Sequence, residues 1–193
     1  MLHSNHVTCL FTFIFSPIEM TDATDNSKKR SSRSAGERRT KLRETLWPDI
    51  KESDLWLRSQ RTGFTTIPRT MSLIGQLLDR AAGKGTPVLS TYLTLWCWIY
   101  DEGIVEIRNQ RELAWESGFS GNRAEGTWRT RMRRLEELGL IKTRPGLAGQ
   151  FQYVLLLNPL KAIQRLYASN TDDLLYVTFL ARLTQIGADD LDI

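Results

Sequence analysis

The strongest constraint on the fold of this chain is the way its sequence pattern changes, several times in quick succession, between residues 104 and 157. Residues 104–107 alternate apolar and polar side chains, which predicts a short strand. Asn109 is followed three residues later by Glu112, the spacing of a helix N-cap and its reciprocal partner. We therefore predict a helix that starts at Asn109 and ends near Gly118.

A second, longer helix is predicted over residues 123–138. Asn122 and Glu125 repeat the spacing of cap and partner before it, and Gly139 stands where the apolar periodicity ends. Glycine is the usual residue just past a helix C-terminus. The two predicted helices are therefore joined by a short turn.

The residues that follow predict a β-hairpin. Residues 140–144 and 151–157 are β-prone, and the segment between them contains Pro-Gly-Leu-Ala-Gly-Gln, a sequence typical of a turn. Asn158 and Pro159 end the second strand. Strand, helix, turn, helix and hairpin in this order predict a mainly α-helical fold with a small antiparallel β-wing.

This stretch resembles the winged helix-turn-helix superfamily of DNA-binding proteins. The resemblance rests on Asn-Gln-Arg-Glu-Leu-Ala-Trp-Glu-Ser-Gly-Phe-Ser at 109–120 and on Leu-Glu-Glu-Leu-Gly-Leu-Ile-Lys-Thr-Arg at 135–144, and it covers roughly residues 86–159. It implies a winged helix-turn-helix whose second helix enters the DNA major groove. The apolar periodicity before and after this stretch adds extra N- and C-terminal helices to the predicted fold. The chain also resembles uncharacterised proteins of bacterial plasmids and other mobile elements.

The predicted helix 123–138 has two chemically different faces. One side groups apolar residues, namely Ala124, Trp128, Met132, Leu135 and Leu138. The opposite side groups small, hydroxyl-bearing and cationic residues, namely Arg123, Gly126, Thr127, Thr130, Arg133 and Arg134. Arginine can bond both acceptors of guanine, and threonine can meet the methyl group of thymine. We therefore expect the N-terminal half to read bases.

Other residues are expected to contact phosphates. We assign this role to Arg133 and Arg134, and we include Asn122, ahead of the helix, in the DNA-binding set. Lys142 and Arg144 in the first hairpin strand either touch phosphates or simply decorate an edge strand. Arg129 and Arg131 lie on the helix flanks, so we place them on the DNA backbone or in internal ion pairs.

Charge is sorted along the chain. The net charge is only +4, but residues 28–43 hold eight basic residues against one acidic residue, and residues 123–144 hold seven against three. Residues 170–193 carry five aspartates and a single basic residue, Arg182. Two basic stretches and an acidic end favour a face that binds a polyanion.

The chain is expected to have four parts. Residues 1–45 form a leader and a flexible basic arm, with one hypothesis being that translation starts at Met20. Residues 46–85 form a helical extension, and residues 86–159 form the winged helix-turn-helix domain. Residues 160–193 form helices that either complete the core or make a dimer seam.

Further helices are predicted within these parts. They cover about 69–82, 86–102, 160–168 and 174–186, with a short amphipathic helix near Leu55 and Trp56. We expect Cys97 to be buried in the helix 86–102. We also expect the tryptophans of the domain to be core residues, namely Trp96, Trp98, Trp115 and Trp128.

An enzyme, a metal site and a cofactor site are not expected. His3 and His6, the only histidines, lie in the leader, which argues against histidine-based catalysis and metal binding. The only cysteines are Cys9 and Cys97, so no disulfide framework is implied and a reducing cytoplasm fits. Residues 7–18 are too short an apolar stretch to span a membrane.

These inferences predict a bacterial cytoplasmic protein, associated with the nucleoid or a plasmid, that binds double-stranded DNA. It would serve as a transcriptional regulator or as a plasmid replication or maintenance factor, and a homodimer would imply an inverted-repeat site. The alternative is a winged-helix module that binds other proteins and not DNA.

Overall fold

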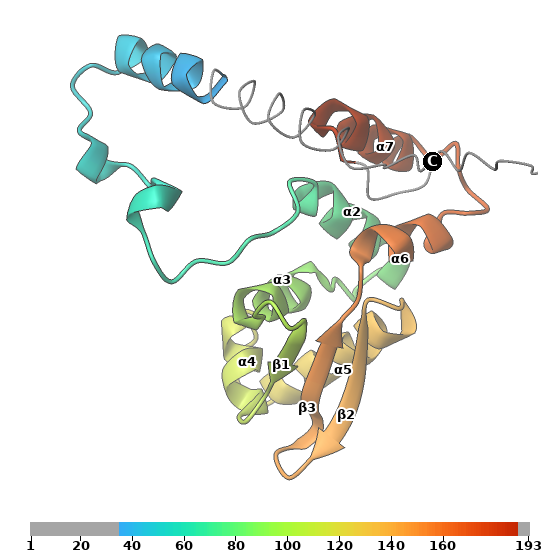
Figure 1. The fold of residues 1–193 in the computed structure, drawn as a ribbon. Coiled ribbons are helices and arrows are strands. Elements are labelled where there is room, and N and C mark those ends of the chain that lie inside the picture. Colours follow the sequence, from blue (N-terminus) through green and yellow to red (C-terminus); the bar gives the residue numbers. More distant parts are fainter. Residues whose placement is uncertain (1–34, 189–193) are drawn as a thin grey trace, which may run out of the picture. The chain divides into compact units, whose positions relative to one another are not determined.

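The computed structural model describes residues 35–188, which belong to two compact units that divide between Thr62 and Gly63 (Figure 1). In the first unit, residues 35–46 are helical, and two short 3-10 helices follow at Glu52–Asp54 and Arg58–Gln60. No residue between 35 and 62 is fully buried. This part of the chain therefore lacks a hydrophobic core of its own.

Two sequence predictions for the first unit are corrected. Residues 35–45, expected to be a flexible arm, are helical, and they are rich in Glu, Arg, Lys and Leu, which are all good helix formers. The amphipathic helix expected near Leu55 and Trp56 is replaced by the 3-10 helices, because a short helix needs a packing partner and Trp56 is 70% exposed. The remainder of the predicted arm, and the leader, lie outside the described residues.

The second unit has helices packed against one face of a small sheet (Figure 1). Its elements are α2 (Met71–Ala82), α3 (Leu89–Trp98), β1 (Ile104–Glu106), α4 (Gln110–Glu116), α5 (Ala124–Glu137), β2 (Ile141–Gly146), β3 (Gly149–Leu156), α6 (Pro159–Leu166) and α7 (Leu174–Ile186). The described part of the chain is thus mainly helical with one small antiparallel sheet. None of its helices is long and apolar enough to cross a membrane.

The three strands pair in the order β1-β3-β2, and both pairings are antiparallel. Val154 of β3 pairs with Val105 of β1 on one side and with Thr143 of β2 on the other. Val105 and Val154 are buried, so this face of the sheet belongs to the core. Phe151 of β3 meets the edge of Trp128 of α5 with 5.7 Å between ring centroids.

Most predicted helix boundaries in this unit are confirmed. The side chain of Asn109 accepts hydrogen bonds from the backbone N–H groups of Arg111 and Glu112, as the cap spacing predicts. Gly139, just past α5, has a φ of +73°, which explains why a glycine ends this helix. Asn122 does not cap α5, because Arg123 occupies the N-cap position and no side chain bonds the first N–H groups.

The tryptophans predicted to be core residues differ in their burial. Trp128 is fully buried as predicted, whereas Trp115 on α4 is 70% exposed. Trp96 and Trp98 are partly buried, and Cys97 is exposed rather than buried. The reason is that α3 carries apolar residues on all sides, while its neighbours, α2, α4 and α5, leave part of its last turn in solvent.

The domain boundary also differs from the sequence expectation. The sequence pattern separates residues 46–85 from the domain, but α2 contributes Ile74, Leu77 and Leu78, all fully buried, to the same core as α5 and the sheet. Both α6 and α7 contact α2. The buried faces of the C-terminal helices therefore complete the core, one of the two alternatives left open by the sequence.

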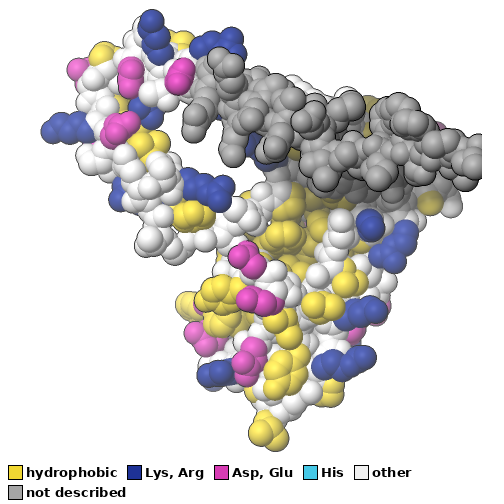
Figure 2. All heavy atoms as spheres, viewed as in Figure 1, with side chains coloured by type: hydrophobic (Ala, Val, Ile, Leu, Met, Phe, Trp, Pro, Cys, Tyr) yellow, Lys and Arg dark blue, Asp and Glu magenta, His cyan; other side chains and the backbone are white. Residues whose placement is uncertain are grey.

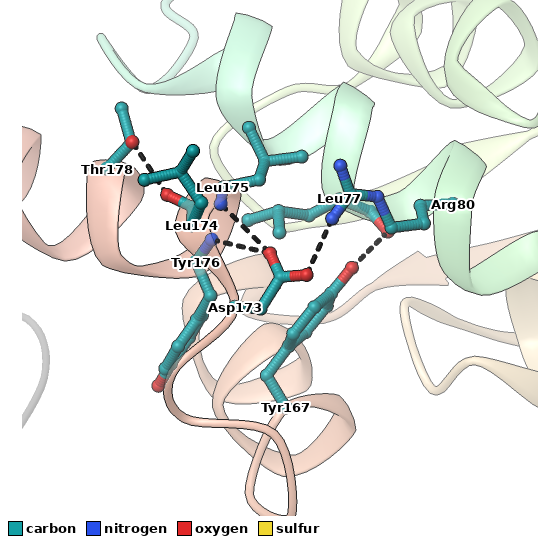
Figure 3. Close-up of polar contacts among 8 residues, drawn as sticks. All are labelled: Leu77, Arg80, Tyr167, Asp173, Leu174, Leu175, Tyr176 and Thr178. Atoms are coloured by element: carbon teal, nitrogen blue, oxygen red, sulfur yellow. Dashed lines mark hydrogen bonds and ion pairs between the residues drawn. The ribbon is translucent and has the colours of Figure 1, made fainter.

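Polar contacts fix α6 and α7 to α2 (Figure 3). Tyr167, at the end of α6, donates a hydrogen bond to the backbone oxygen of Leu77 at 3.1 Å. Asp173 caps α7 by accepting from the N–H groups of Leu175 and Tyr176, and it pairs with Arg80 of α2 at 2.6 Å. One carboxylate therefore both starts α7 and attaches it to α2.

Asp173 makes the stability of the unit pH-dependent. The Tyr176 N–H makes the largest contribution to lowering the pKa of this carboxyl below 3.8, and Arg80 and the Leu175 N–H lower it further. A carboxyl whose pKa is lower in the folded state stabilises the fold fully when the pH is above its unfolded-state pKa. This stabilisation is lost as the pH falls through its folded-state pKa. Asp173→Asn should therefore lower the free energy of unfolding at neutral pH, and this difference should shrink in acid.

The measurement is urea unfolding of the wild type and Asp173→Asn from neutral pH down to below pH 3.8. Asp172→Asn, a change in the exposed neighbouring residue, is the matched control and should follow the wild type more closely. A difference between Asp173→Asn and the wild type that stays constant over the whole pH range would contradict the assignment.

Candidate nucleic-acid interface

The helix α5 is held in place by one apolar face. Trp128, Met132 and Leu135, spaced by four and three residues, are completely buried. The helix contacts α3, α4 and β2 on this side. Burial of large side chains such as these stabilises the fold by about 1.5–3 kcal/mol each. The sequence therefore fixes which side of α5 faces solvent.

The exposed side of α5 begins at its N-cap and runs along the helix. Arg123, Gly126, Thr130 and Arg133 are exposed, and their spacing of three, four and three residues places them in one row, here called the α5 stripe. Within the described residues, the side chains of Arg123 and Arg133 make no hydrogen bond or ion pair. The α5 stripe thus offers two uncompensated positive charges to solvent.

Gly126 lies in the middle of this row. A Cβ atom added at Gly126 would meet no heavy atom within 4 Å, so the fold leaves open space beside its backbone. The hydroxyl of Thr130 donates to the backbone oxygen of Gly126 at 3.0 Å. Thr127 is partly buried on the flank, and Asn122 is exposed in the turn before α5. Packing in the described structure does not require a glycine at position 126.

Arg134 does not belong to the exposed row, which corrects its predicted role as a phosphate contact. Its guanidinium donates to the backbone oxygens of Ala81 at 2.7 Å and Ala82 at 3.2 Å, at the end of α2. It also pairs with Glu137 at 2.8 Å. These acceptors occupy all three guanidinium nitrogens, so Arg134 joins α5 to α2. A helical projection of α5 cannot show the contact with α2, because Ala81 and Ala82 belong to another helix.

The two flanking arginines also make internal contacts. Arg129 pairs with Glu125 at 2.7 Å, which confirms the ion-pair alternative for this residue. Arg131 donates to the backbone oxygen of Gly85 at 3.0 Å, in the connection between α2 and α3. Of the arginines on α5 itself, Arg133 is therefore the one left without a partner among the described residues.

A chain of hydrogen bonds links α5 to the tip of the β2–β3 hairpin. Arg129 donates to the side-chain oxygen of Gln110 at 3.1 Å, and the amide nitrogen of Gln110 donates to the backbone oxygen of Ala148 at 3.1 Å. Gln110 is almost fully buried. Gly149 has a φ of +120°, which favours glycine, and a Cβ atom there would also lie only 2.4 Å from the Gln110 nitrogen. Gln110 was not identified from the sequence, where the position only opens a helix.

The strand β2 presents its cations away from α5. Thr143 faces the helix, since both its backbone N–H and its hydroxyl bond Glu136 of α5 at 2.9 Å. Neighbouring residues of a strand point to opposite faces, so Lys142 and Arg144 project from the other face, where both are exposed. Figure 2 shows Lys and Arg side chains along the β2 side of this face. The structure therefore separates these two cations from the α5 stripe.

The described residues contain no group of three or more His, Cys, Asp or Glu side chains that could hold a metal ion. His3 and His6 lie outside these residues. The chain matches no protein-family model, no curated protein and no solved structure. The candidate interface therefore rests on the geometry of α5 and of the hairpin attached to it.

Arg134 and its neighbour Arg133 provide a direct test of this division of roles. Arg134→Ala removes two hydrogen bonds at the α2–α5 contact and one ion pair within α5, and it should lower the free energy of unfolding by about 1–3 kcal/mol. Arg133→Ala removes an exposed side chain without a partner and should change it by no more than about 0.5 kcal/mol. Chemical denaturation measures both, and equal effects of the two substitutions would contradict the assignment.

Proposed function

We propose that residues 86–159 form a winged helix-turn-helix that binds double-stranded DNA through α5. The order of elements supports this proposal, because a helix and a strand precede the helix pair α4–α5, and a hairpin follows it and pairs with that strand. In such a fold α4 crosses the DNA backbone, α5 enters the major groove and the β2–β3 hairpin is the wing.

The observation that carries the proposal is the α5 stripe. Arg123 and Arg133 are cations without protein partners among the described residues, and Gly126 between them has open space beside its backbone. Glycine inside a helix costs about 1 kcal/mol relative to alanine. The described packing does not account for that cost, whereas close approach of DNA to the helix backbone would.

Within this proposal the residues have different tasks. Arg123, Gly126, Thr127 and Thr130 occupy the N-terminal half of α5 and would face base edges. The hydroxyl oxygen of Thr130 can still accept a hydrogen bond, although its proton is directed to Gly126. Phosphate contacts would come from Arg133 and from the exposed Asn122, Lys142 and Arg144, and no longer from Arg134.

The biological setting is proposed on the resemblance described above. It would be transcriptional regulation in a bacterial cytoplasm, or the replication or maintenance of a plasmid, with the protein on the nucleoid or on the plasmid. A homodimer would place two copies of α5 on an inverted repeat. On α7, Leu174 and Val177 are exposed on the side away from the core, and this side offers a surface for such pairing.

Selection of bound sites from a pool of random duplexes, followed by titration of the selected duplex, tests DNA binding. We expect affinity to fall steeply with salt, because each phosphate contact contributes about 0.9 to the slope of log affinity against log salt. Arg123→Ala should lose about 1–3 kcal/mol of discrimination between the selected and a random duplex.

Lys161→Ala is the matched control for Arg123→Ala. It removes the same charge from an exposed residue of α6, at the opposite end of β3 from the hairpin tip. This variant should bind both duplexes as the wild type does. Absence of duplex binding even at low salt would overturn the proposal and favour a winged-helix module that binds proteins. The stoichiometry of the complex tells a monomer from a dimer.

Gly126→Ala separates binding from folding. The added methyl group meets open space and alanine is the better helix former, so the free energy of unfolding should rise by about 0.5–1 kcal/mol. The same methyl group should weaken duplex binding, because it stands on the surface that approaches the DNA. Thermal unfolding and duplex titration of one preparation measure both effects, and an unchanged affinity would argue against close approach at Gly126.

A further inference from the structure

A groove of about 750 Å³ runs along β1, the edge strand on the other side of the sheet from β2. Aromatic side chains line it from two parts of the unit, with Trp98 and Tyr100 at the end of α3 and Tyr153 on β3. Carboxylates complete the lining, namely those of Glu102, Glu106 and Glu112. The groove is separate from the α5 stripe and shares no residue with it.

The backbone of β1 can accept another strand here. The N–H of Ile107 donates to Gln152 of β3, and the oxygen of Gly103 accepts from Leu156 of β3. Backbone groups of successive strand residues point alternately to the two sides, so those of Ile104 and Glu106 point away from β3. Within the described residues β1 has no second neighbouring strand. Its outer edge is therefore free for strand addition.

Apolar side chains are exposed along this groove. Tyr100 is 80% exposed, and Ile104 and Tyr153 are 47% and 40% exposed. Leu155, the cross-strand neighbour of Ile104, is 42% exposed. The indole of Trp98 is held in position by a hydrogen bond to the carboxylate of Glu116 on α4. Contiguous apolar surface bounded by polar groups marks interaction sites on protein surfaces.

The charge of the groove identifies the class of occupant. The groove lining includes the carboxylates of Glu102, Glu106 and Glu112 and one cation, Arg108, which pairs with Glu106 at 3.3 Å while its side chain is 83% exposed. Arg144 of β2 lies cross-strand from Tyr153. Such an exposed pair is weak and can be exchanged for another cation. Figure 2 shows Asp and Glu side chains among apolar ones over α4 and β1. These carboxylates attract a positively charged peptide, and the exposed rings favour one that also has apolar side chains.

We propose that this groove binds an extended, basic segment of a partner protein, which adds to β1 as a further strand. Main-chain hydrogen bonds to Ile104 and Glu106 would hold the segment in register. Alternate side chains of an added strand lie on one face, so its Arg or Lys residues would meet the carboxylates and the aromatic face of Tyr100 or Trp98. This inference goes beyond DNA binding and does not depend on it.

Three short synthetic peptides of related composition test the proposal by fluorescence anisotropy at physiological ionic strength. In the first, Arg and Val alternate, and in the second the same residues are grouped into an Arg block and a Val block. In the third, Glu replaces Arg in the alternating order. We expect the first to bind at least about tenfold more tightly than the second, and the third not to bind. Equal binding of the first two would overturn strand addition.

Variants of the exposed carboxylates locate the binding. The triple variant Glu102→Gln, Glu106→Gln and Glu112→Gln should lose at least about tenfold in affinity for the alternating peptide. The control variant Glu37→Gln, Asp49→Asn and Asp172→Asn removes the same charge from exposed residues elsewhere and should bind as the wild type does. Equal loss in both variants would show non-specific attraction and overturn the proposal.

Amide exchange gives a readout that does not depend on charge. Binding of the alternating peptide should slow exchange of the Ile104 and Glu106 N–H groups, and unchanged exchange at both would contradict strand addition. The triple variant Glu102→Gln, Glu106→Gln and Glu112→Gln should still bind duplex DNA. Loss of peptide binding and loss of DNA binding are therefore distinguishable, and each proposal stands or fails on its own measurement.

Discussion

Burial of one face of α5 is the constraint on which the rest of the second unit depends. Trp128, Met132 and Leu135 are completely enclosed, and Trp128 meets Phe151 of the sheet in an edge-to-face contact. Once this face is fixed, the opposite row from Arg123 to Arg133 must face solvent. The same burial sets the distance of α5 from α2, which allows Arg134 to reach the last backbone oxygens of that helix. Exposure of the α5 stripe is therefore a consequence of core packing.

Buried polar groups then determine how the hairpin lies on the helices. Gln110 connects Arg129 of α5 to Ala148 at the hairpin tip, and Glu136 of α5 receives both bonds of Thr143. A buried amide must satisfy both its donor and its acceptor, so these contacts permit little variation in hairpin position. For a DNA-binding unit of the proposed kind, this means that α5 and the wing would approach a duplex as one body. These contacts engage Arg129, which would otherwise be available to bind phosphate.

The second unit also has two surfaces of opposite chemistry. The α5 stripe is cationic and contains small and hydroxyl-bearing residues, whereas the groove along β1 combines carboxylates with exposed aromatic rings. The two surfaces share no residue. A protein bound to DNA through α5 would therefore keep the β1 edge available for another chain.

The sequence by itself determined the elements that depend on neighbouring residues. Cap spacing at Asn109, the glycine at position 139 and the periodicity from Trp128 to Leu135 are local signals, and the helices and hairpin appear close to their predicted bounds. Only the tertiary structure decided the role of Arg134, the outward position of Trp115 and the sheet face of Lys142 and Arg144. The backbone oxygens of Ala81 and Ala82 that bind Arg134 lie more than fifty residues away from it in the sequence. The side of a strand that faces the core follows from the pairing register of that strand. Such contacts depend on which elements meet in space, and no local pattern contains that information.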